Sequence, residues 1–144
     1  MSATAESNKK LVREYLNAFN DRDRERLSEL LAEDAVEHGI HEELRGTDEI
    51  LEFLDRYVEV FPDYSGETEA MVADGDTVAV RYTVSGTHKG EYLDVEPTGY
   101  RAEWTGMAFY RVEGGEIAEA WIEEDRLGLL EHLEAVDPPA HLRI

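Results

Sequence analysis

The sequence predicts an α+β fold in which N-terminal helices pack against an antiparallel sheet. Up to Pro62, apolar residues recur every three or four positions, which is the spacing of one face of an α-helix. After Pro62 they alternate with polar residues, which is the period of a β-strand. Tight-turn sequences separate the alternating segments, as they do in an antiparallel meander.

Three helices are expected before Pro62. The first covers residues 7–20, where apolar side chains fall on one face and charged side chains on the other. A second, short helix follows the polar break at residues 21–23 and covers residues 27–31. The third begins at Thr47, because Thr is a favourable N-cap residue, and it ends at Pro62 because proline cannot continue a helix.

Four longer strands are expected after Pro62, and a brief one over residues 35–38 precedes the third helix. The four cover residues 65–73, 77–88, 100–112 and 116–124. Residues 74–76 (Asp-Gly-Asp) and 113–115 (Glu-Gly-Gly) are tight-turn sequences, whereas residues 89–99 form a longer connection. A last short helix is expected over residues 127–133.

The 144 residues fit a single domain over residues 1–144, with flexible tails expected at residues 1–6 and 137–144. Hydrophobic residues make up 42% of the chain, which excludes an intrinsically disordered class. Cysteine is absent, so disulfide and thiol chemistry are excluded. No apolar run reaches the ~18 residues that span a bilayer, and the first residues lack the apolar core of a secretory signal. A cytoplasmic location is therefore expected.

The formal net charge is −20, from 34 Asp and Glu against 14 Lys and Arg. Such a surface repels nucleic-acid phosphates and anionic lipids, so neither nucleic acid nor a membrane is expected as a partner. Lysine is scarce among the basic residues, and the acidic ones are spread through every expected element. This pattern is typical of proteins from halophiles, in which concentrated salt screens self-repulsion. An ordinary acidic protein is the alternative.

Stability is expected to rise steeply as KCl or NaCl is added toward molar concentrations, because salt screens the repulsion among acidic side chains. The melting temperature, followed by circular dichroism from low to molar salt, measures this effect. A melting temperature that stays flat or falls over that range contradicts the halophilic interpretation.

The last strand carries the first candidate for chemistry. Side chains alternate along a strand, so Trp121, Glu123 and Asp125 are expected on one face. Glu124 is expected on the opposite face, in solvent. A carboxyl group beside an indole in an apolar setting has a raised pKa, which suits it to proton transfer near neutral pH. Asp125 is therefore the candidate acid or base, although a strand end that turns toward water has the same pattern.

Two long segments carry a resemblance to a known family. The first runs from NKKLVREYLNAFNDRD through LSELLAEDAVEHG to the helix that ends at residues 60–63, Val-Phe-Pro-Asp. The second is GTHKGEYLDVEPTGYRAEWTGMAFYRVEGGEIAEAWIEEDRLGLLEHL. Together they resemble the SnoaL-like polyketide cyclases, small α+β-barrel proteins of the nuclear-transport-factor-2-like superfold. The resemblance implies a cone-shaped barrel, with helices packed in a curved antiparallel sheet, a pocket at its open end, and a homodimer through the outer sheet face.

The resemblance also implies roles for individual residues. Asp125 matches the acidic residue that ends the last strand in this family, where it is the general acid and base. His38 and His88 match positions that are commonly His, and they are expected to assist, although a lone His at a strand end is more often a structural hydrogen-bonding group. A small apolar ligand is expected to contact some of a set that also suits a plain core: Trp104, Trp121, Tyr15, Tyr57, Phe19, Phe53 and Met107. Glu123 is a further candidate for contact with the ligand, and its alternative is a side chain that points outward at the rim.

The implied function is cofactor-free acid–base chemistry, an aldol cyclisation or an isomerisation, on an apolar small molecule that bears a carbonyl group. No metal or organic cofactor is expected, since His38 and His41, with Glu37 and Glu42, lack a recognised ligand spacing. Two alternatives stay open. One is hydrolysis of an epoxide or an ester, with Asp125 and a His activating water. The other is a non-catalytic module for ligand binding or dimerisation.

Overall fold

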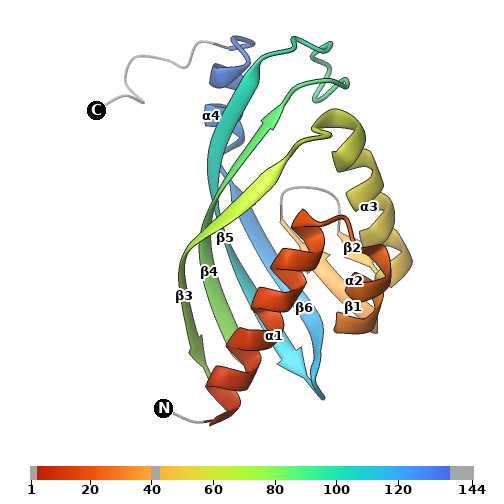
Figure 1. The fold of residues 1–144 in the computed structure, drawn as a ribbon, viewed down its shortest axis with the longest axis vertical. Coiled ribbons are helices and arrows are strands. Elements are labelled where there is room, and N and C mark those ends of the chain that lie inside the picture. The colour runs from red at the N-terminus through yellow and green to blue at the C-terminus, as the bar shows by residue number, and fades with distance from the viewer. Residues whose placement is uncertain (1–2, 40–42, 137–144) are drawn as a thin grey trace.

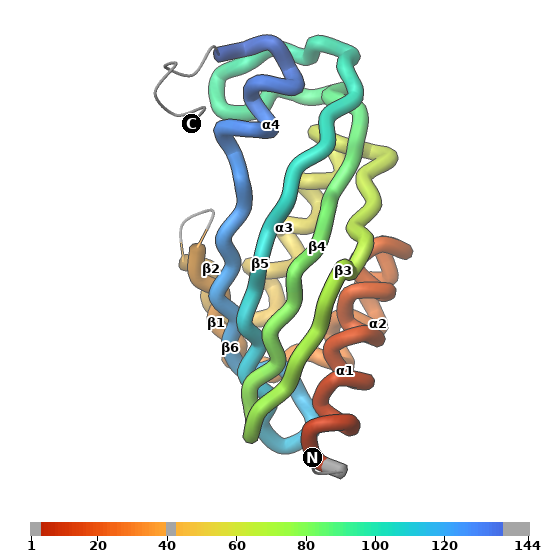
Figure 2. The backbone as a smooth tube through the Cα atoms, turned by 90° about the vertical axis from the view of Figure 1, so that its left-hand side faces the viewer, coloured from red at the N-terminus to blue at the C-terminus, as the bar shows by residue number. Residues whose placement is uncertain are grey.

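The computed structural model describes residues 3–39 and 43–136 of the protein. Its elements in chain order are α1 (Ala3–Asn20), α2 (Arg24–Leu30), β1 (Leu31–His38), β2 (Leu44–Arg45), α3 (Thr47–Val60), β3 (Ser65–Asp74), β4 (Thr77–Thr87), β5 (Arg101–Glu113), β6 (Glu116–Glu124) and α4 (Arg126–His132). Figure 1 shows α1, α2 and α3 on one side of a curved sheet, with α4 at one end. In Figure 2 the same three helices lie together behind the sheet. The predicted α+β class is confirmed.

The six strands form one sheet in the order β2-β1-β6-β5-β4-β3. Strands β3 to β6 form the expected antiparallel meander, and β2 pairs antiparallel with β1. Strand β1 runs parallel to β6, so the expectation of a wholly antiparallel sheet is wrong at this pair. Tight turns impose the antiparallel direction on consecutive strands. The chain between β1 and β6 is long, because it contains α3 and the strands β3 to β5, and a connection of this length permits a parallel pair.

The N-terminal helix is longer than expected. It begins at Ala3, so residues 3–6 belong to α1 and not to a flexible tail. The expectations for residues 1–2 and 137–144 fall outside the described part of the chain.

Two further boundaries differ from the expected ones. Strand β1 begins at Leu31, earlier than the brief strand expected over residues 35–38. The N-cap of α3 is Gly46 rather than Thr47. The hydroxyl of Thr47 instead donates a hydrogen bond to the carbonyl oxygen of Ala32 (3.1 Å), which ties the start of α3 to β1.

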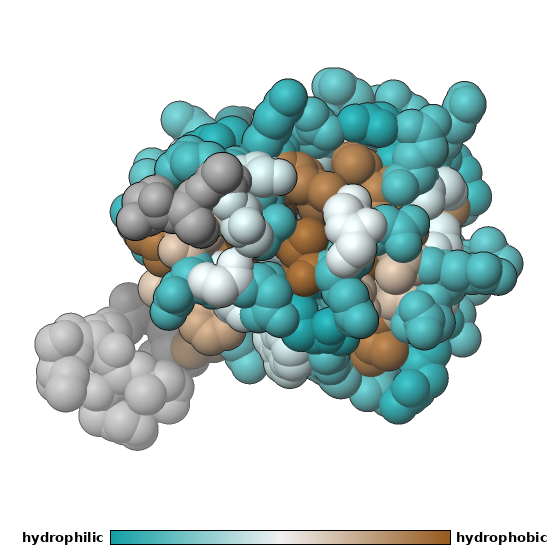
Figure 3. Space-filling view, turned by 90° about the horizontal axis from the view of Figure 1, so that it is seen from below, coloured by the Kyte–Doolittle hydropathy of each residue, from teal (hydrophilic) through white to brown (hydrophobic). Residues whose placement is uncertain are grey.

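The core lies between the sheet and the three N-terminal helices. Along most of β5 every second residue is buried and its neighbours are exposed, as alternation requires. The buried residues join a cluster that includes Val12, Leu27, Leu54 and Phe61, each at most 1% exposed. Hydrophilic side chains surround a group of apolar ones on the end of the molecule seen in Figure 3. Among the described residues, no helix is both long and apolar enough to cross a membrane.

A β-bulge in β6 decides which of its side chains face the core. Two successive residues of β5 pair with Glu119 and Ile117, so Ala118 is an extra residue in the ladder. Ile117 is buried, and strict alternation from it would turn Trp121 and Glu123 inward. The extra residue shifts the alternation of inward and outward side chains by one position. Because this alternation has a period of two residues, every later side chain of the strand changes its face. The inward residues that follow the bulge are Ala120, Ile122 and Glu124.

Candidate active site

A cavity lies between α1, α3 and the sheet. It encloses about 90 Å³ of space for the centres of water molecules, which is room for several waters or a small organic molecule. Its walls are mostly aromatic and aliphatic, with two carboxyl groups among them. The lining residues are Tyr15, Leu16, Phe19, Asn20, Glu37, Phe53, Tyr57, Tyr64, Gly66, Thr68, Tyr82, Val84, Tyr110, Ile122 and Glu124. An apolar pocket with a few polar groups is the usual form of a small-molecule site.

Glu37 is a buried acid that enters the cavity from β1. Its side chain points inward from the position paired with Ala120 of β6, and the residue is only 5% exposed. No hydrogen-bond donor among the described residues reaches its Oε2. Burial, and then the negative charge of Glu124, raises the pKa of Glu37 to about 7. Glu37 is therefore suited to release and take up a proton near neutral pH.

Glu124, the last residue of β6, is the second acid. Its Oε2 accepts a hydrogen bond from the hydroxyl of Tyr82 (2.6 Å), and its Oε1 accepts one from the indole Nε1 of Trp104 (3.0 Å). Burial raises the pKa of Glu124, while the two donors act in the opposite direction. These donors favour the ionised form of Glu124, whereas Oε2 of Glu37 has no donor among the described residues, so Glu37 is the acid better suited to carry an exchangeable proton.

Two tyrosines accompany Glu37 in the cavity. The rings of Tyr15 and Tyr110 meet edge to face, with centroids 5.7 Å apart. Burial raises the pKa of both phenols, and the charge of Glu37 is the next largest cause for each. Both phenols therefore stay protonated at neutral pH. They are hydrogen-bond donors close to the acid, as stabilisation of a developing oxyanion requires.

The residues expected on the inner face of the last strand lie elsewhere. Trp121 is 41% exposed, Glu123 is exposed, and neither lines the cavity, because the bulge turns this side of β6 outward. Asp125 is exposed and is the N-cap of α4, where its Oδ1 accepts a hydrogen bond from the backbone N–H of Gly128 (2.8 Å). Met107, on the outward side of β5, is 60% exposed. The inward placement expected for these side chains is therefore corrected.

His88 is buried but lies outside the cavity lining. Its Nδ1 accepts a hydrogen bond from the backbone N–H of Thr98 (3.1 Å), and its ring packs on Phe61 with centroids 6.0 Å apart. The carbonyl oxygen of His88 also accepts a hydrogen bond from the N–H of Gly99. Burial lowers the pKa of His88, which favours the neutral ring. These contacts connect the end of β4 to the loop that follows it, which is a structural task.

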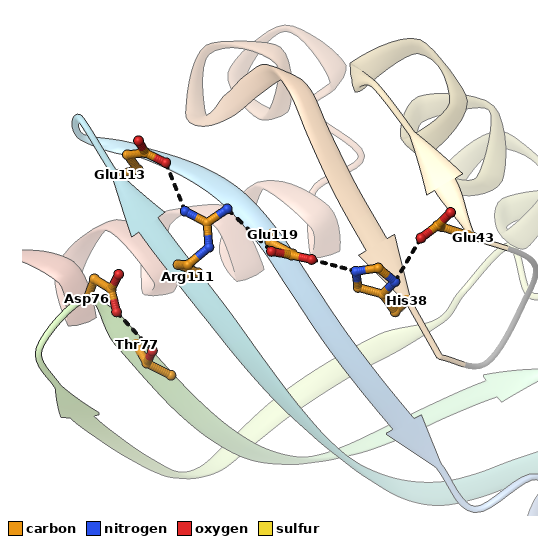
Figure 4. Close-up of polar contacts among 7 residues, drawn as sticks. All are labelled: His38, Glu43, Asp76, Thr77, Arg111, Glu113 and Glu119. Atoms are coloured by element: carbon orange, nitrogen blue, oxygen red, sulfur yellow. Dashed lines mark hydrogen bonds and ion pairs between the residues drawn. The ribbon is translucent and has the colours of Figure 1, made fainter.

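His38 lies on the outer side of the sheet. Its Nε2 is 2.6 Å from a carboxylate oxygen of Glu119 and its Nδ1 is 3.1 Å from one of Glu43 (Figure 4). Arg111 binds the other oxygen of Glu119 (3.3 Å). The imidazole also stacks on Trp121, with centroids 5.5 Å apart. His38 thus belongs to a surface network of charges across β1, β6 and β5, and not to the cavity.

Four of the aromatic residues expected in a pocket do line the cavity, namely Tyr15, Phe19, Phe53 and Tyr57. Trp104 holds Glu124 without being a lining residue itself. Among the described residues, no group of three or more His, Asp or Glu has the arrangement of a metal site; His41 and Glu42 lie outside that part of the chain.

The two acids were missed for different reasons. Glu37 lies two residues after Ala35 in a strand, so its side chain points to the same, inward face. A charged residue at a core position of this kind is a signal that the sequence itself contains. Glu124 continues the inward series from Ala120 and Ile122, but this is visible only once the bulge is known.

Gly106 separates the partners of the second acid. It lies between Tyr82 and Glu124 in one cross-strand row of β4, β5 and β6. A Cβ atom at this position would lie 2.6 Å from the Tyr82 hydroxyl oxygen and 2.8 Å from Cγ of Glu124. Only a residue without a side chain lets these two groups form a hydrogen bond across the strand.

Gly106→Ala is therefore expected to push Tyr82 and Glu124 apart and to lower the free energy of unfolding by about 1–3 kcal/mol. Urea unfolding followed by circular dichroism measures this. Thr105→Ala, at the exposed neighbouring position, is the matched control and should change stability little. Equal effects of the two substitutions would contradict the packing role of Gly106.

Comparison with known proteins adds family and fold relations. Residues 9–133 match the model of a family described as SnoaL-like polyketide cyclase. AclR from Streptomyces galilaeus, provisionally assigned as a hydroxylase, is 29% identical, with a TM-score of 0.80 over 94% of this chain and 87% of its own. IdmH from Streptomyces antibioticus, provisionally assigned as a polyketide cyclase, is 32% identical, with a TM-score of 0.78 over 88% and 98%. A SnoaL-like protein from Jannaschia, 19% identical with a TM-score of 0.86 over 96% and 98%, shows the shared fold alone. No curated protein is significantly similar to the chain.

Proposed function

Because the chain belongs to the SnoaL-like polyketide cyclase family, we propose that it catalyses cofactor-free proton transfer on an apolar, carbonyl-bearing small molecule held in the cavity. The reaction class is an aldol cyclisation or an isomerisation. One observation carries the proposal: two inward-facing carboxyl groups share an aromatic cavity with phenolic donors, and one of them is hydrogen-bonded while an oxygen of the other has no donor among the described residues. Pairs of acids whose environments separate their pKa values are typical of acid–base sites.

In the proposed mechanism Glu37 moves the proton. As a carboxylate it removes a proton from the carbon next to the carbonyl group, and the electron pair of the C–H bond passes into an enolate. The phenols of Tyr15 and Tyr110 donate hydrogen bonds to the enolate oxygen. In a cyclisation, the enolate carbon attacks a second carbonyl group of the same molecule, and the new alkoxide takes the proton back from Glu37. In an isomerisation, the proton returns to a different carbon.

Glu124 acts on this reaction through Glu37. Its negative charge helps hold the pKa of Glu37 at about 7, near the value at which one group works well both as base and as acid. The hydrogen bonds from Tyr82 and Trp104 favour the ionised form of Glu124 against the effect of burial, and they fix its side chain in place. The acid–base role first expected for Asp125, with help from His88 or His38, is thereby assigned to acids that line the cavity.

The proposal is tested by solvent exchange. The protein is incubated in D₂O with a panel of apolar aryl ketones, and deuterium uptake next to the carbonyl group is followed by NMR. Exchange above the buffer rate is expected, and it should increase as the pH rises through about 7, because only the ionised form of Glu37 removes a proton. No exchange, together with turnover of epoxides or esters, would replace this function by hydrolysis. Ligand binding without either reaction would leave a binding module.

We also propose a homodimer that forms through the outer face of the sheet, because large apolar side chains are exposed there. Val72, Phe109 and Trp121 are 66%, 56% and 41% exposed, and they lie in one cross-strand row with Ala79. Contiguous exposed apolar side chains of this kind mark interaction surfaces. Sedimentation equilibrium should give twice the chain mass, and Phe109→Glu should reduce it to the chain mass. A monomer before the substitution would refute the dimer.

A further inference from the structure

The charge of the cavity lining is unbalanced. Of the described residues that line it, two are carboxylic acids and none is Lys, Arg or His. Glu124 already accepts two hydrogen bonds, but both donors, the Tyr82 hydroxyl and the Trp104 indole, are neutral groups. A buried pair of carboxyl groups with no cationic side chain among the described lining residues favours a positively charged partner.

Glu37 lacks a partner on the side of its Oε2. This oxygen is buried, and no donor among the described residues reaches it. A buried carboxyl oxygen in this position is satisfied either by its own proton or by a donor that enters from the cavity. The side chain is more than nine-tenths buried, so bulk water does not supply that donor freely.

Six of the lining residues form a continuous chain of aromatic rings. In spatial order it runs Tyr110, Tyr15, Phe19, Tyr64, Tyr57 and Phe53, and each centroid lies 5.1 to 6.3 Å from the next. Tyr64 already has the guanidinium of Arg22 over its ring, 4.4 Å from the centroid. Aromatic faces attract cations, most strongly where water is excluded. The ring chain and the two carboxyl groups together form the kind of cage that recognises a substituted ammonium ion.

We propose that the cavity binds a small organic monocation, a substituted ammonium group, with its charge between the carboxyl groups of Glu37 and Glu124 and beside the chain of aromatic rings. This inference rests on the proposed function only in placing the ligand in the same cavity, and it adds the charge of that ligand.

Two arginines lie near the cavity but do not line it. Arg22 binds the carbonyl oxygens of Asn20 and Pro62 from beside Tyr64. Arg126 lies over the ring of Tyr92 at 5.8 Å, and its charge affects the pKa of Glu124 less than burial and the two hydrogen bonds do. Neither arginine is a lining residue, so each leaves the space between the acids to the ligand.

Cation binding is expected to release a proton. A positive charge beside Glu37 favours its ionised form, so a cation binds better as the pH rises through about 7. A neutral ligand that donates a hydrogen bond to Glu37 has no such requirement. The dependence of affinity on pH therefore separates the two ligand classes.

The test compares choline with its uncharged isostere, 3,3-dimethylbutan-1-ol, by isothermal titration calorimetry at constant ionic strength. Choline is expected to bind at least about tenfold more tightly, since the two differ only in charge. Titration in two buffers of different ionisation enthalpy should show proton release at pH 7 for choline and none for the alcohol. Equal affinities, tighter binding of the alcohol, or no binding of either ligand would overturn the proposal.

Substitutions show which carboxyl group the charge of choline interacts with. Glu37→Gln should weaken choline binding about tenfold or more and remove the proton release, and it should change the affinity for the alcohol much less. Glu123→Gln, on the exposed outer face of the same sheet, is the matched control and should leave both affinities unchanged. Equal effects of the two substitutions would mean that choline responds to overall charge and does not occupy the cavity.

The solvent-exchange assay keeps this proposal separate from the proposed function. Exchange on neutral ketones without choline binding would refute the cationic ligand and leave the acid–base function standing. Choline binding that depends on Glu37, without exchange on any ketone, would refute the acid–base function and make the cavity a cation-binding site.

Discussion

Glu37→Gln is expected to slow proton transfer in the cavity by about 10²–10⁴-fold, because the amide of glutamine cannot take up a proton from carbon. Glutamine has nearly the same shape, so the cavity and its aromatic walls should persist. Solvent exchange on the best ketone of the panel, measured as a rate per enzyme molecule, provides the readout. A loss of this size in a folded protein would identify Glu37 as the group that moves the proton.

Asp125→Asn is the informative control for this loss. Asparagine is also a good N-cap, so the substitution should leave both α4 and the exchange rate nearly unchanged. Glu124→Gln should act differently: by removing the neighbouring negative charge it lowers the pKa of Glu37, so the rise of rate with pH moves to lower pH. If Asp125→Asn abolished exchange and Glu37→Gln did not, the group that moves the proton would be Asp125 and not Glu37.

The same substitution, Glu37→Gln, is expected to stabilise the folded protein at alkaline pH. The pKa of Glu37 is raised from 4.5 to about 7 on folding, so ionisation of this group favours the unfolded chain. Below about pH 4.5 the group is protonated in both states and has no effect. Between these values the unfolded chain releases its proton first and stability falls. Above about pH 7 the free energy of unfolding is lower by the full amount, on the order of 3 kcal/mol, and the Glu37→Gln variant does not suffer this loss.

Urea unfolding of the wild-type protein and the variant at pH 5 and pH 8 measures this difference. The variant should gain little at the lower pH and most at the higher one. Glu123→Gln also removes one negative charge but from an exposed position, so it reveals how much of any gain is a general effect of net charge. A variant that is less stable than the wild type at pH 8 would show that the ionised form of Glu37 is not a source of instability.

Both expected effects come from one physical fact, which is that the surroundings of Glu37 disfavour its ionised form. Active sites commonly retain such groups at the expense of stability. Here the energetic penalty and the useful pKa have the same origin, so a substitution that removes the penalty removes the chemistry as well.

The order and type of most elements follow from the sequence itself. The period of apolar residues is a local property, and it changes from helical to alternating at Pro62, where α3 has just ended and β3 is about to begin. The same periodicity places Tyr15 and Tyr57 on helix faces that meet the core, and both line the cavity. Turn sequences rich in glycine also locate the hairpins within one or two residues.

Only the tertiary structure decided which acids enter the cavity. One extra residue in β6 reverses the parity of the strand, and this depends on the pairing with β5 rather than on any residue in β6 alone. The parallel pairing of β1 with β6 then places Glu37 on the same sheet face as Glu124, although the two lie far apart in the chain. Their pKa values depend on burial and on each other's charge, and both exist only when the chain is folded.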